Sequence, residues 1–281
     1  MKNPFPPCLW LALTAVFLPS TAQAVLVFAS DFNTTPDPTP GFANNPVGGN
    51  TAGYTDTSPN GTRAIMISDV STSNGGSAVL DMDALPAFST ALPGQNELRI
   101  SADFAVTSLG SAAQNTNSLP RMLLRSTATN GDTVTAQTLT LGFGRNASDT
   151  LILYAARSEN AAPNHSSAVV LAEFGTYSAT AADNDTDYSF ISFVISYTQG
   201  SSQFNISAFN GLNLIGSGTV TGFSSSLTFT QTTTAFLAAV GNTSTSVLYL
   251  DNVRVETVPE PTAAALASLA LIGLVHRRRR R

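Results

Sequence analysis

The sequence predicts an all-β fold, a sandwich of two antiparallel sheets that is either a jelly roll or a related arrangement. The first observation is strict alternation, clearest in residues 98–106, where Leu98, Ile100, Phe104 and Val106 share one face. The second is that turn dipeptides such as Asn210-Gly211 separate these runs. The third is that residues 25–257 show no sustained 3.6-residue periodicity with helix caps.

About a dozen runs have the alternation or the β-branched and aromatic content of strands. The predicted strands are 25–29, 65–70, 78–83, 98–106, 121–126, 139–143, 151–156, 169–174, 189–197, 204–208, 234–240 and 247–256. Turns are expected at 74–76, 130–132, 199–200 and 210–211. In residues 138–143, Leu139, Leu141 and Phe143 are predicted to face the core, with Thr138 and Thr140 on the opposite, polar face.

Two irregular segments and one bulge are also predicted. Residues 33–62 are rich in Pro, Gly, Asn and Thr and are interpreted as one long loop, and 111–120 as another. In the last strand the apolar phase slips from Leu248 and Leu250 to Val253 and Val255. A β-bulge at 251–252 would restore the facing of both pairs.

Residues 1–24 have the layout of a secretion signal. Lys2 supplies the positive end, residues 9–18 the apolar core, and Ala22-Gln23-Ala24 the small-x-small cleavage site. The only cysteine, Cys8, would leave with this peptide. The exported chain would therefore contain no disulfide and would depend on core packing, with or without help from a metal.

Residues 258–281 have the layout of a membrane-directed tail. Pro259-Glu260-Pro261 precedes an uncharged, mostly apolar run (262–275), then His276 and five arginines: Arg277, Arg278, Arg279, Arg280 and Arg281. The prolines keep the neck extended, and the arginines would hold the end in the cytoplasm. The run is shorter than the ~20 residues that span a bilayer, so a buried core helix is the alternative. A core helix gives no reason for five terminal arginines.

This tail resembles the PEP-CTERM sorting signal of bacterial surface and exopolysaccharide-associated proteins, over the last 24 residues (258–281) only. The resemblance implies a membrane-anchored precursor and an exosortase-type protease that cuts near Pro259, Glu260 and Pro261. It also implies delivery to the cell surface or extracellular matrix.

A second resemblance concerns the domain between the two signals, residues 25–257. Tyr188-x-Phe190-x-x-Phe193-x-Ile195-x-Tyr197, a turn, Phe204-x-Ile206-x-x-Phe209 and Asn210-Gly211 resemble the central meander of concanavalin A-like, laminin-G-like jelly rolls. Asp31-Phe32 after the first strand and 249–255 as the last strand fit the same family. The resemblance implies that the first and last strands lie together.

The net charge of the segment between the two signals restricts the classes of partner that it can bind. Without the two terminal signals the chain has seven arginines, no lysine and seventeen acidic residues, a net charge of about −10. The arginines are scattered along the sequence. Nucleic-acid binding needs a clustered basic surface, so this class is disfavoured.

Catalytic constellations are not visible in the sequence. β-Glucanases of the resembled fold carry a Glu-x-Asp-x-(x)-Glu strand with two carboxylates about 5 to 5.5 Å apart, and no such run occurs here. A Ser-His-Asp set would have to use His165, the one histidine of the exported segment, which is expected to be a solvated loop residue. The chain is therefore not expected to be an enzyme.

Asp183, Asp185 and Asp187 alternate with Asn184 and Thr186, and hard oxygens so spaced suit Ca²⁺. The run lacks the glycine and glutamate of an EF-hand loop. A solvated acidic turn is the simpler interpretation and is the one favoured.

Aromatic residues in turn-rich sequence, Tyr54, Tyr177 and Phe42, suit either a sugar platform or closure of the core edge. The sequence thus predicts an exported protein, structural or adhesive within an exopolysaccharide layer. The alternatives are a carbohydrate-binding, lectin-like module and, third, a polysaccharide hydrolase or lyase.

Overall fold

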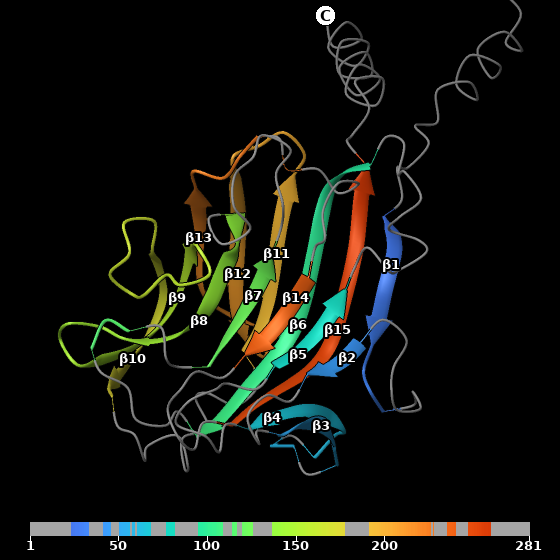
Figure 1. The fold of residues 1–281 in the computed structure, drawn as a ribbon, viewed down its shortest axis with the longest axis horizontal. Helices are drawn as coiled ribbons and strands as arrows, with labels where there is room; N and C mark the ends of the chain where they lie inside the picture. Colours follow the sequence, from blue (N-terminus) through green and yellow to red (C-terminus); the bar gives the residue numbers. More distant parts are fainter. Residues whose placement is uncertain are drawn as a thin grey trace, which may run out of the picture.

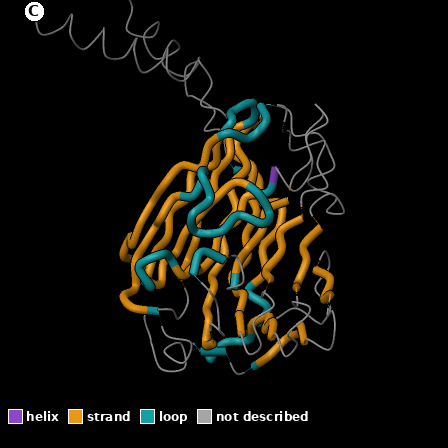
Figure 2. The backbone as a smooth tube through the Cα atoms, turned by 60° about the vertical axis from the view of Figure 1, so that its left-hand side comes forward, coloured by secondary structure: helices purple, strands orange, loops and turns teal. Residues whose placement is uncertain are grey.

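The structure is a computed structural model that describes residues 24–33, 42–45, 51–56, 58–59, 61–68, 77–81, 95–108, 114–116, 120–125, 137–177, 191–225, 227, 235–239 and 247–259. Of residues 42–45, 51–54, 77–81, 95–96, 107–108, 235–239 and 259 only the backbone is described. The chain in this part is mostly strand (Figure 2). Residues 1–23 of the predicted signal peptide (1–24), Asp183, Asp185, Asp187 and residues 260–281 lie outside the described residues.

Sheet A has the strand order β13-β12-β11-β6-β15-β4-β3, and β1 also pairs with β15 (Figure 1). Its strands are β1 (Val25–Ser30), β3 (Thr51–Thr55), β4 (Ala64–Ser68), β6 (Gln95–Ser108), β11 (Ile191–Thr198), β12 (Gln203–Asn210), β13 (Asn213–Thr221) and β15 (Val247–Pro259).

Sheet B has the order β10-β9-β8-β7-β14-β5-β2. Its strands are β2 (Phe42–Asn45), β5 (Ser77–Asp81), β7 (Arg121–Arg125), β8 (Leu139–Arg145), β9 (Thr150–Arg157), β10 (Val169–Thr176) and β14 (Ala235–Ala239). Every pairing in both sheets is antiparallel. The predicted two-sheet antiparallel sandwich is therefore confirmed.

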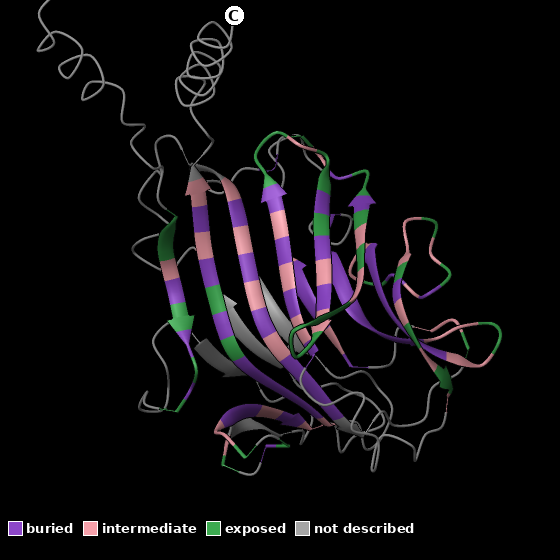
Figure 3. Ribbon diagram, turned by 180° about the vertical axis from the view of Figure 1, so that it is seen from behind, coloured by how far each residue is buried: buried purple, intermediate pink, exposed green. Residues whose placement is uncertain are grey.

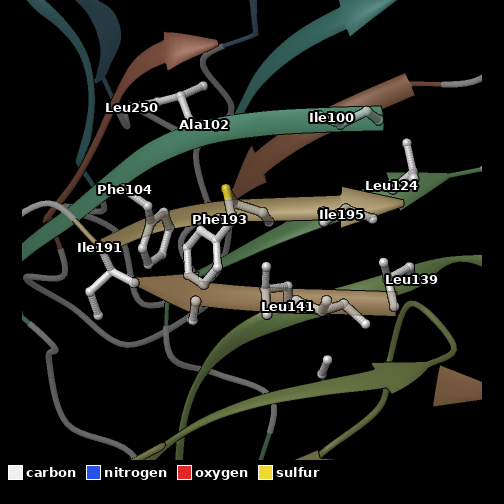
Figure 4. Packing of buried hydrophobic residues seen from close by; sticks show 14 of the residues in the cluster. Ile100, Ala102, Phe104, Leu124, Leu139, Leu141, Ile191, Phe193, Ile195 and Leu250 are labelled. Atoms are coloured by element: carbon white, nitrogen blue, oxygen red, sulfur yellow. The ribbon is translucent and has the colours of Figure 1, made fainter. Parts of the chain in front are cut away.

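Aromatic and aliphatic side chains of both sheets fill the space between them (Figure 4). Phe104 of β6 stacks on Phe143 of β8 with ring centroids 5.7 Å apart, and meets Phe193 of β11 edge-on at 5.8 Å. Such aromatic pairs add about 0.5–1.5 kcal/mol beyond the area they bury. Alternate residues of β11 are buried and half-buried, as the stripes on sheet A show (Figure 3).

Two glycines let the sheets meet along one side, where β13 of sheet A approaches β10 of sheet B. A Cβ placed on Gly216 would lie 1.7 Å from the Leu171 carbonyl oxygen, and one on Gly218 would lie 2.5 Å from Cγ1 of Val169. No side chain fits there, so glycine at both positions permits the close approach.

The first and last strands lie side by side, as the resemblance implied: β1 pairs with β15, with Val25 opposite Thr257 and Ser30 opposite Val253 (Figure 1). The bulge predicted at 251–252 is also confirmed. The register of β15 against β6 shifts between Asp251 and Arg254, and Asn252 has a φ of 48°.

Three strands were not predicted. Residues 33–62, interpreted as one loop, contain β2 and β3, and this prediction is wrong at those two places. Both strands are short, and Phe-Ala-Asn-Asn and Thr-Ala-Gly-Tyr-Thr lack the apolar alternation that signals a strand. In β13, two positions in register with the buried Ala208 and Ile206 are Gly216 and Gly218. Because β10 lies so close, these two positions are glycines, and β13 lacks the apolar alternation by which a strand is recognised in a sequence.

Candidate functional site on the outer face of sheet B

Two arginines lie on the face of β7 that points away from the core. Met122 and Leu124 belong to the buried cluster between the sheets, so Arg121, Leu123 and Arg125 occupy the opposite face. Both arginines are half-buried. This outer face of sheet B carries the candidate site.

Loop residues 158–168 cover part of the same face, over β8 and β9. Tyr154 packs with Ala161 in a small buried cluster together with Ile152 and Ala156, and the Tyr154 hydroxyl donates to the Ala161 carbonyl at 2.8 Å. The outer face of β9 is therefore buried and mostly apolar where the loop crosses it.

The same loop corrects the prediction for Thr138 and Thr140. Both were expected on an exposed polar face, and both are fully buried. The Ser158 amide donates to the Thr138 carbonyl at 2.7 Å, and the Thr140 hydroxyl donates to the Ser158 carbonyl at 2.8 Å. The alternation predicts the strand correctly, but it does not show that a loop covers the second face.

Two glycines of β8 let the loop and Arg121 lie close to the sheet. A Cβ on Gly144 would lie 2.3 Å from Cγ of Pro163, so the loop rests directly on the backbone there. A Cβ on Gly142 would lie 2.6 Å from Cβ of Arg121. The missing side chain at Gly142 is what gives Arg121 its space on the sheet.

The electrostatics of the site combine two guanidinium groups with one carboxylate. Arg125 forms a short ion pair with Glu159, the second residue of the loop. Burial lowers the pKa of Arg121, while Tyr154 and Glu159 raise it and Arg125 lowers it further. Burial also raises the pKa of the Tyr154 hydroxyl to about 12. The site is therefore partly buried and carries a positive charge that one carboxylate offsets only in part.

His165 lies in this loop, as expected, and is half-buried. Its Nδ1 lies 2.8 Å from Oγ of Ser167 and accepts from the Ser167 amide at 3.2 Å. Oγ of Ser167 in turn accepts from the Arg157 amide at 2.9 Å. These bonds hold the loop against the end of β9, so His165 has a structural role here.

The residues that the sequence singled out do not come together in the described part. Pro259 ends β15, with Gln95 as its register partner; Glu260, Pro261 and Arg277, Arg278, Arg279, Arg280 and Arg281 lie outside the described residues, as do the three aspartates. Within the described ranges no group of three His, Cys, Asp or Glu side chains could hold a metal. The described residues also include no helix with the length and apolarity that a bilayer crossing requires.

Tyr177 is the one candidate sugar platform whose side chain is described. It packs against the core cluster, and the guanidinium of Arg145 lies 4.8 Å from its ring centroid. This contact supports closure of the core edge rather than an open platform. Only the backbone is described at Phe42 and Tyr54.

In the sequence the arginines and Glu159 stand out only as scattered charges, so they were not predicted as site residues. A usable signal was present in the predicted strand 121–126. Residues four apart on a strand share a face, so Arg-Met-Leu-Leu-Arg places both arginines on the side opposite Met122 and Leu124. Glu159 follows a different strand, and no local pattern brings it to this face.

No family model matches the chain, and no curated protein matches it either. Solved structures do. A carbohydrate esterase from the Shiga toxin-encoding bacteriophage phi24B aligns with a TM-score of 0.51 and 13% identity over 84% of this chain and 99% of that one. At that identity it shows a shared fold alone.

Two further alignments have lower TM-scores. Peanut lectin with a nine-residue peptide gives 0.47 at 10% identity, over 84% of this chain and 99% of that one. The CBM2 module of the evolved Dit of Lactobacillus casei BL23 phage J-1 gives 0.45 at 15% identity, over 84% and 97%.

Proposed function

We propose that this chain is an exported protein, sorted by a PEP-CTERM-like signal, that acts as a structural or adhesive component of an exopolysaccharide layer. In this proposal the sandwich is of the concanavalin A-like type and binds polysaccharide through the outer face of sheet B. It performs no catalysis.

The observation that carries the proposal is the pairing of Val25 with Thr257. Val25 directly follows the predicted cleavage site at Ala24, and Thr257 directly precedes the tail 258–281. Both predicted signals therefore join the domain at the same end. A domain attached at one end presents its sheet faces and its other end to the surroundings, which suits a displayed binding or adhesive protein.

The composition supports an extracellular setting. The exported segment has no cysteine and no lysine, and hydroxyl and amide side chains fill most polar positions. The outer face of sheet A follows this rule: the Ser192 hydroxyl donates to Asp103 at 2.6 Å, and the Thr219 hydroxyl donates to Asn205 at 2.8 Å.

The sorting part is tested by intact mass and fractionation of the protein from its native cells. In the natural chain we expect a surface or matrix species that lacks both residues 1–24 and the arginine tail. Replacement of Pro259, Glu260 and Pro261 by alanine should leave the full C-terminus in the inner membrane. Alanine at Pro36 and Pro38 is the matched control and should not change processing. A natural chain that keeps its arginines in the inner membrane contradicts the proposal.

The adhesive part is tested by deletion and by binding to immobilised polysaccharide. We expect loss of cell aggregation on deletion, and binding with a dissociation constant of about micromolar to millimolar. Turnover of a polysaccharide by the purified protein would replace the adhesive proposal with the hydrolase or lyase alternative.

A further inference from the structure

We infer that Arg121 and Arg125, with Glu159 beside them, form a site for the carboxylate groups of an acidic polysaccharide. We call these three residues the arginine site. The inference rests on the proposed function and deepens it, because it names the chemical class of the polysaccharide and the residues that select it.

The arginine site has two guanidinium groups and one carboxylate, whereas four other arginines of the domain are paired one to one. Arg63, Arg99, Arg145 and Arg254 each form an ion pair with a carboxylate of their own, at Asp56, Glu97, Asp149 and Glu256. At the arginine site Glu159 pairs with Arg125 and also acts electrostatically on Arg121. Two guanidinium charges and one carboxylate leave a local charge of about +1 on a domain with a net charge near −10.

The hydrogen-bonding capacity of the site is not fully used by the protein. Nε of Arg125 is shielded from solvent and has no hydrogen-bond partner within the described residues. A shielded donor without a partner is costly, and a guanidinium can donate two parallel hydrogen bonds to one carboxylate. About a third of the Arg125 side chain is exposed to solvent (34%).

The surroundings of the site favour a polymer that lies on the sheet. Loop residues 158–168 cover β8 and β9 and border the site on one side. The hydrogen bond from Tyr154 and the contact of Pro163 with Gly144 hold the loop in place. On the other side the register partners of Arg121 and Arg125 on β14 are Ala239 and Ala235. Both arginines thus lie next to this loop on one side and next to the two alanines of β14 on the other.

The negative charge of the domain adds selectivity. It repels highly charged polyanions at long range, so affinity must come from short-range contacts with the two guanidinium groups. Planar carboxylates match the guanidinium fork, whereas a neutral sugar gains nothing from a positive charge.

The experiment measures binding of the protein purified from its native cells to polygalacturonate, before and after chemical reduction of its carboxyl groups to alcohols. We expect binding to the acidic polymer and at least tenfold weaker binding to the reduced polymer. Arg121→Gln and Arg125→Gln should each lower the affinity about tenfold, the effect of losing a charge-assisted hydrogen bond.

Glu159→Gln gives the most specific test. It removes the carboxylate that competes with the ligand, so binding should become a few-fold tighter, whereas a merely structural Glu159 would give no gain. Arg99→Gln is the matched control, because Arg99 lies on sheet A and pairs with Glu97. Thermal unfolding of every variant checks that the fold is intact. Should Arg121→Gln fail to fold, Arg125→Gln and Glu159→Gln still decide the question.

The arginine site and the proposed function can be contradicted independently of each other. Equal binding of the natural and carboxyl-reduced polymers, unaffected by Arg125→Gln and Glu159→Gln, removes the arginine site and leaves polysaccharide binding standing. Binding of free galacturonate that depends on Arg125, without binding of any polysaccharide, upholds the carboxylate site and removes the proposed function.

Discussion

The Thr62 hydroxyl donates to Oδ2 of Asp251 at 2.9 Å, joining residues 189 positions apart in the chain. Asp251 is 1% exposed, and its Oδ1 accepts from the Asn252 amide at 2.7 Å. The segment that precedes β4 is therefore fastened to the bulge of β15.

Thr62→Val should destabilise the domain by about 1–3 kcal/mol, because it removes a donor from a buried carboxylate oxygen without changing the shape of the side chain. Chemical denaturation followed by fluorescence measures the change. Thr219→Val is the matched control: its bond to Asn205 is exposed, and the change should stay within about 0.5 kcal/mol. Equal effects of the two variants would contradict the role given to Thr62.

Gly216→Ala should destabilise the domain by at least about 1–3 kcal/mol, since the added methyl group would have to displace the Leu171 backbone. Gly61→Ala is the control. Its Cβ would meet nothing within 4 Å, so only the φ of 75° opposes it, at a cost of about 1 kcal/mol. Thermal unfolding ranks the two variants. A Gly216→Ala protein as stable as the natural one would show that the two sheets do not need this close approach.

Stability should fall as the pH rises from about 10 to 12. A tyrosine in the unfolded chain loses its proton near pH 10, whereas Tyr154 in the folded domain holds its proton up to a pKa of about 12. The unfolded state therefore binds fewer protons in this window, and the folded state loses up to about 3 kcal/mol from this group. The pKa of Tyr197 is raised in the same direction, also to about 12.

Tyr154→Phe tests this assignment. It should lower stability at neutral pH by about 1 kcal/mol, through loss of the bond to Ala161, and should flatten the alkaline decline. Urea denaturation at a series of pH values measures both effects. An unchanged alkaline slope in Tyr154→Phe would assign the decline to other groups.

Calcium removal should leave the melting temperature unchanged if Asp183, Asp185 and Asp187 form a solvated acidic turn, the interpretation that the sequence favours. Calorimetry before and after dialysis against a chelator measures this. A melting temperature that falls on chelation, and does so no longer when the three aspartates are replaced by asparagine, would instead establish a calcium site that staples the loop.

Sequence patterns predict a strand well where apolar residues alternate along it or form a continuous run. The alternation in residues 98–106 is reproduced in β6, and the phase slip after Leu250 correctly located the bulge at Asn252. These features succeed because the side-chain period of a strand is fixed by its geometry.

The failures arise where packing changes the pattern. β13 lacks a hydrophobic face because β10 leaves room only for glycine, and Thr140 is buried by a loop that follows the next strand. The candidate site was half predictable for the same reason. The shared face of Arg121 and Arg125 follows from local geometry, whereas the arrival of Glu159 depends on how the loop packs.

The position of β15 has a mechanical consequence. It is hydrogen-bonded to β6 along most of its length, with β4 on its other side over residues 247–250 and β1 over 253–257. A tensile force applied at Pro259 along the strand would load these bonds in shear, many at once, and would not peel them apart one after another. The domain therefore resists extraction by its C-terminal end far better than it would if that end belonged to an edge hairpin.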